Sequence, residues 1–190
     1  PHDYLWLGTF SRALMHQQLN LAYDRGIDRM WILNVGDIKP AEYQMELFMD
    51  MAWDIDSVRT QGVKGHLKGF LAREFGADNA PELADAMMES YRLAFVRKPE
   101  FMGNTREEEY YNPYWRIVRD LPWREDSLLR RVGEYERLSD RVELAAGYIP
   151  ERLRDAYFQL VKYPVQAAAQ MNRKMVFAQM ARHGKTSWSA

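Results

Sequence analysis

The spacing of hydrophobic residues changes near residue 57, from short unbroken runs to helical stripes. Residues 4–7 (YLWL) and 29–35 (RMWILNV) are apolar runs of strand length, and a glycine follows each of them. Apolar side chains at helical spacing follow each run, over about 11–25 and 41–53. The order predicts β-α-β-α, two successive units of a parallel α/β sheet whose second strand is buried on both faces.

After residue 57 the pattern predicts helices and no convincing strand. Four stripes recur at three- and four-residue spacing: Val63 to Leu71, Leu83 to Phe95, Leu128 to Ile149, and Leu153 to Ala178. Four amphipathic helices predict a bundle. Pro164 lies inside the last stripe and is expected to kink that helix, because proline removes a hydrogen bond and clashes with the preceding turn.

The predicted fold class is therefore an α/β part followed by an all-α part. Residues 1–57 form the β-α-β-α portion and residues 58–190 form the helical bundle. The charges divide near the same place. Residues 1–56 carry nine acidic and four basic residues, a net charge of −5, whereas residues 57–190 carry 18 and 22, a net charge of +4.

Composition excludes several classes of protein. The 190 residues are 47% apolar and 28% charged, as in a soluble globular protein. The net charge of −1 gives no basic field for nucleic acid or anionic lipid, and no stretch approaches the ~18 apolar residues of a membrane span. The absence of cysteine excludes disulfides and thiolate sites. The start at Pro1, without an initiator methionine or signal peptide, predicts a piece of a longer protein.

The main candidate site follows the second apolar run. Asn34 ends the run, Gly36 lets backbone approach a ligand, and Asp37 and Lys39 come within reach of the same edge. Polar groups at the carboxyl end of a buried parallel strand are where α/β folds place ligands. Trp6 ends the other run and could stack on a sugar or a base. The alternative is an ordinary strand-to-helix turn with a core tryptophan, and residue chemistry alone favours that alternative.

Other features of the sequence are weaker indications of a functional site. The aromatic segment 101–123 contains arginines suited to phosphate, but acidic residues offset them and packing over the bundle is favoured. Asp50, Asp54 and Asp56 are interpreted as a solvated helix end. No histidine has a partner at metal-ligand spacing, so the sequence predicts no metal and no cofactor; the histidines are His2, His16, His66 and His183.

Residues 31–40 (WILNVGDIKP), followed by Glu42, resemble glycoside hydrolase family 115, the xylan α-1,2-glucuronidases. Three further stretches resemble the same family in the same order: residues 4–7, 21–29 and 158–165, the last with Asn172. The resemblance covers most of the chain and is weak only over residues 99–125. A ten-residue run with a second match more than a hundred residues away is a fairly specific signal.

The resemblance implies that residues 1–57 are the last two units of a (β/α)₈-type barrel and that residues 58–190 are the helical domain after it. Asn34 matches a position that lines the family's active site, and Lys39 and Trp6 are further candidates for binding substrate. The family's catalytic carboxylates lie on earlier strands, so the resemblance places them outside this chain and assigns it no catalytic residue.

The expected function is thus that of a fragment of an inverting glycosidase that removes (4-O-methyl)glucuronic acid from xylan. The expected partner is glucuronoxylan or its oligosaccharides, with no nucleic acid and no membrane. The longer parent is expected to be periplasmic or secreted and could form a homodimer. The alternative is a non-enzymatic helical interaction module attached to a degenerate barrel.

Overall fold

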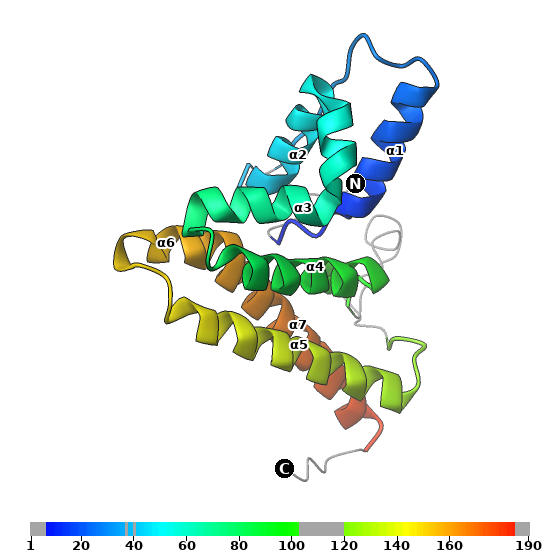
Figure 1. The fold of residues 1–190 in the computed structure, drawn as a ribbon. Helices are drawn as coiled ribbons and strands as arrows, with labels where there is room; N and C mark the ends of the chain where they lie inside the picture. Colours follow the sequence, from blue (N-terminus) through cyan, green and yellow to red (C-terminus); the bar gives the residue numbers. More distant parts are fainter. Residues whose placement is uncertain (1–6, 37, 40, 103–119, 185–190) are drawn as a thin grey trace.

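The computed structural model describes residues 7–36, 38–39, 41–102 and 120–184, and every regular element in these ranges is helical (Figure 1). In chain order the longer helices are α1 (Arg12–Asp24), α2 (Glu42–Trp53), α3 (Ile55–Phe75), α4 (Ala80–Val96), α5 (Glu125–Ala146) and α7 (Tyr163–Arg182). The short ones are η1 (Pro99–Phe101), η3 (Glu151–Leu153), α6 (Arg154–Tyr157) and η4 (Phe158–Lys162).

The predicted α/β part is wrong, because the described residues contain no strand. Residues 29–35 form an extended connection from α1 to α2. Alternate side chains, Trp31 and Leu33 among them, are half-buried against the core, while Met30 and Ile32 are 75% and 81% exposed. A strand needs a second backbone to pair with, and no described backbone group hydrogen-bonds to this segment. An all-α fold therefore replaces the predicted sheet and barrel units.

Local sequence signals explain where the first helices begin and end. The Ser11 hydroxyl accepts a hydrogen bond from the Leu14 amide at 3.2 Å and caps α1, and Gly26 follows that helix at φ 82°. Asp54 caps α3 by accepting from the Ser57 amide at 3.0 Å. Gly62, at φ 64° and ψ 168°, kinks α3, and Figure 1 shows the two halves of that helix running in different directions.

The predicted bundle is present. α4 packs between α3 and α5, and α5 packs along α7 (Figure 1). One hydrophobic core joins α1, α2, α3, α4, α5, α7 and the segment before α7, and its largest fully buried side chains include Leu47, Leu67, Leu83, Tyr135 and Tyr157. A second cluster, with Leu128 and Val176 at its centre, joins α5 to α7. These two clusters hold the helices that position every candidate site described below.

The predicted kink at Pro164 stays a prediction, but the α-helical pattern is interrupted just before that residue. A π-helical turn, η4 (Phe158–Lys162), stands directly before α7, and Pro164 lies in the first turn of α7. Proline has no N–H to donate to the turn before it, so the α-helical ladder cannot continue unbroken through this position. Within this turn the Tyr163 amide donates to the Phe158 carbonyl, five residues earlier, as in a π-helix.

The predicted division at residues 57 and 58 falls in the first turn of α3, which packs against α2 on one side and α4 on the other. The division stays a prediction. Within the described residues, the helices are either too short or too polar to cross a membrane.

Candidate functional site

The predicted site residues lie on or near the connection between α1 and α2. Asn34 and Lys39 are both exposed there, and the Asn34 side chain makes no hydrogen bond to another described residue. Trp6 and Asp37 lie outside the described residues. The connection itself is anchored by Trp31, whose Nε1 donates to the Ile27 carbonyl at 2.7 Å.

Beside this connection lies a groove of about 380 Å³ between it and the junction of α2 with α3. Its walls are aromatic: the Trp31 ring lies 6.1 Å from that of Phe48, and Trp53 at the end of α2 is 92% exposed. Carboxylates share the groove, from Asp28 and from the residues that begin α3. Aromatic faces and carboxylate acceptors can contact the C–H faces and hydroxyls of a sugar.

Asn34 and Lys39 do not line this groove, although Leu33 next to Asn34 does. The structure therefore places the predicted polar residues next to an aromatic groove rather than inside it. Trp53 was not among the residues predicted to form a site, because the apolar spacing over 41–53 does not show which side chains of the helix are exposed. Asp54, interpreted as part of a solvated helix end, caps α3.

A second, enclosed cavity lies under the residues that precede α1. Arg12 is buried there with its guanidinium carbon 3.6 Å from the centre of the Tyr91 ring, and its Nη1 donates to the Phe10 carbonyl at 2.7 Å. Burial lowers the pKa of Arg12 and raises the pKa of Tyr91; it also raises that of Tyr135, to about 12. The cavity measures about 30 Å³, which is too small for a sugar, and the contact of Arg12 with Tyr91 holds the start of α1 against α4.

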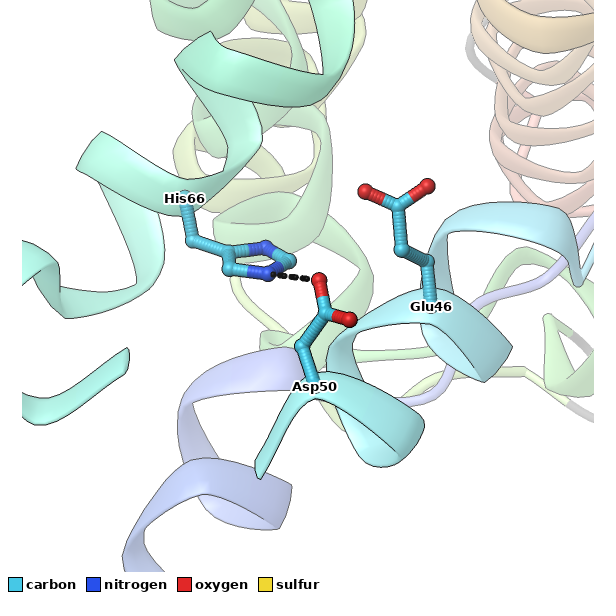
Figure 2. A group of neighbouring side chains, drawn as sticks. All are labelled: Glu46, Asp50 and His66. Atoms are coloured by element: carbon cyan, nitrogen blue, oxygen red, sulfur yellow. Dashed lines mark hydrogen bonds and ion pairs between the residues drawn. The ribbon is translucent and has the colours of Figure 1, made fainter. Parts of the chain in front are cut away.

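Among the described residues, one group of side chains could hold a metal ion: Glu46 and Asp50 of α2 with His66 of α3 (Figure 2). The His66 ring is only 6% exposed, and its Nε2 donates to Asp50 Oδ2 at 2.9 Å. Sequence reasoning overlooked this group because sixteen residues separate Asp50 from His66. Only the four-residue spacing of the two carboxylates was visible as a signal.

The profile of glycosyl hydrolase family 115 matches residues 1–101. A solved structure of a family 115 4-O-methyl-α-glucuronidase, described as specific for decorated arabinogalactans, is similar to this chain at 59% sequence identity and a TM-score of 0.93. The match covers 99% of this chain and 25% of that enzyme, so the chain spans about a quarter of its length. No curated protein matches the chain. The resemblance read from residues 31–40 is thus confirmed, and the chain belongs to glycosyl hydrolase family 115.

Proposed function

We propose that this chain is part of a longer α-glucuronidase that removes glucuronic acid or 4-O-methylglucuronic acid side chains from xylan. One observation carries the proposal, the 59% identity over 99% of the chain with a 4-O-methyl-α-glucuronidase. Glucuronoxylan is the first substrate to test. A decorated arabinogalactan is the second, because the similar enzyme is described as specific for such polymers.

In the proposed reaction, a carboxylic acid outside this chain protonates the leaving oxygen while a second carboxylate activates water, with inversion. This chain contributes to the rim of the active site. The Asn34 amide donates to a uronate oxygen or a hydroxyl, the Lys39 ammonium pairs with the uronate carboxylate, and Trp6 offers a stacking surface. The exposure of Asn34 and Lys39 supports this division of roles, because neither side chain is buried in the chain's own core.

The test is an assay of the complete protein on both polysaccharides, with release of uronic acid as the readout. Proton NMR of the first product formed shows whether the anomeric configuration is inverted. The 190-residue chain alone is expected to release nothing. Failure of the complete protein to release uronic acid from either polymer overturns the proposal and favours the alternative, a non-enzymatic helical interaction module.

Asn34→Ala tests the contribution of this chain. Loss of one ligand hydrogen bond costs ~1–3 kcal/mol, which lowers kcat/KM by about tenfold to a hundredfold. Because Asn34 is exposed, the substitution should change stability by less than about 0.5 kcal/mol. Gln18→Ala, an exposed amide on α1, is the matched control and should leave kcat/KM unchanged. An Asn34→Ala protein with the kcat/KM of the control removes Asn34 from the proposed site.

The remaining proposals concern partners and location. The longer protein is proposed to act in the periplasm or outside the cell as a homodimer, without binding nucleic acid or membrane. Light scattering on the complete protein tests the dimer. Titration with labelled single-stranded DNA at low salt tests the absence of nucleic-acid binding.

A further inference from the structure

Two acidic side chains of α2 and one histidine of α3 converge at the junction of these helices. Glu46 and Asp50 are four residues apart, so their carboxylates project from the same face of α2, and Figure 2 shows both directed toward the side on which His66 lies. One ligand atom from each of the three residues can be chosen so that all three lie within 4.8 Å of one another. A pair of ligands at i and i+4 on one helix, completed by a third from a neighbouring element, is a geometry that chelates a metal ion.

The surroundings of the three groups suit a cation. The His66 ring is buried and therefore held in place, whereas the Asp50 side chain is half-exposed and leaves a path from solvent. Arg73 of α3 donates to Glu46 Oε1 and orients that carboxylate, as outer hydrogen bonds orient metal-binding carboxylates. Two carboxylates against one guanidinium leave the cluster with a net negative charge when the imidazole is neutral.

We propose that Glu46, Asp50 and His66 form a binding site for a divalent transition-metal cation such as Zn²⁺. One oxygen of each carboxylate and Nε2 of the imidazole are the three protein ligands, and water completes the shell. In the structure Nε2–H donates to Asp50, so ion binding moves the imidazole proton to Nδ1 and frees the Nε2 lone pair for the ion. The bound ion then fastens α2 to α3. This inference does not rest on the proposed glycosidase function.

The competing explanation is that the same residues are two structural ion pairs, His66 with Asp50 and Arg73 with Glu46. Two substitutions separate these explanations without removing the contacts between helices. In Asp50→Asn and Glu46→Gln, the amide oxygen still accepts a hydrogen bond from His66 or Arg73, but the anionic ligand is gone. Both variants are therefore expected to fold, which circular dichroism can verify.

The experiment is isothermal titration of the chelator-treated complete protein with Zn²⁺. The wild-type protein is expected to bind one equivalent of Zn²⁺ at this site. Asp50→Asn and Glu46→Gln are expected to bind Zn²⁺ at least about tenfold more weakly. His183→Gln is the matched control, because His183 also pairs with an aspartate: its Nε2 lies 2.5 Å from Asp120 Oδ2. Unlike His66, it belongs to no three-ligand group among the described residues. That variant should bind Zn²⁺ like the wild type.

Thermal unfolding gives an independent readout. At a free Zn²⁺ concentration of about 100 times the Kd, the Tm of the wild type should rise and that of Asp50→Asn should rise much less. Equal Zn²⁺ stoichiometry and affinity in the wild type and Asp50→Asn overturns the proposal. It leaves the cluster as a pair of structural ion pairs.

Discussion

The buried guanidinium of Arg131 is expected to be among the most costly side chains to remove. Arg131 extends from α5 with 3% of its surface exposed. Its Nε donates to Asn172 Oδ1 at 2.6 Å, its Nη1 to the Leu93 carbonyl at 3.0 Å, and its Nη2 to the Arg97 carbonyl at 2.5 Å. One side chain thus ties α5 to α7 and to the negative end of the α4 dipole.

Replacing Arg131 with methionine keeps an unbranched side chain and removes all three donors. Asn172 Oδ1 is then left as a buried acceptor, whereas the Leu93 carbonyl keeps the Arg97 amide as a donor at 3.3 Å; each lost hydrogen bond from the charged guanidinium costs ~1.5–3 kcal/mol. Burial lowers the pKa of Arg131, so the variant also escapes a desolvation cost, which reduces the expected net loss to about 2–4 kcal/mol. For a chain of this size that loss lowers the Tm by about 4–16 °C.

Thermal and urea unfolding followed by far-ultraviolet circular dichroism measures this loss. Arg141→Met is the control, because Arg141 also lies on α5 and donates to Glu82, but at the surface. Its loss should cost less than about 1 kcal/mol. If Arg131→Met lowers the Tm no more than Arg141→Met does, the reasoning from buried acceptors is refuted.

Two further predictions concern backbone strain and pH. Gly62→Ala should lower stability by ~1–3 kcal/mol, because its φ of 64° and ψ of 168° lie in a region that essentially only glycine occupies. Gly69→Ala in the same helix should raise stability by ~0.5–1 kcal/mol, because alanine favours a helix and nothing lies within 4 Å of the added methyl group. Urea unfolding of both variants compares them directly. The pKa of His16 is lowered by burial and by nearby Arg59. Below about pH 6.5 the unfolded chain therefore takes up a proton that the folded chain resists, and stability decreases as the pH is lowered. Between pH 7.5 and pH 5.5, the Tm of His16→Gln should decrease less than the Tm of the wild type.

The helices were predictable because their signals are local. Apolar spacing and the end signals at Ser11 and Gly26 need no knowledge of the rest of the fold, and the structure places the two ends of α1 at these residues. The run at 29–35 was misread because an unbroken apolar run of strand length is typical of a strand buried on both faces, whereas Met30 and Ile32 are exposed and no second backbone among the described residues pairs with the segment. The contact between His66 and Asp50 was not predictable, because it depends on how α2 and α3 pack.

Four carboxyl groups of this chain are poorly suited to act as a catalytic acid. A general acid of a glycosidase needs a raised pKa so that it stays protonated near neutral pH. Every pKa shift that the structure gives for a described carboxyl is downward, and each is caused first by a hydrogen bond from a basic side chain: Asp85 with Lys64, Glu89 with Arg92, Asp120 with Arg182 and Glu143 with Lys162. Such groups are ionised at neutral pH and can hold helices together, but they do not suit proton donation to a leaving group. The proposal places the catalytic pair outside the chain, and uronic acid release by the 190 residues alone would contradict it.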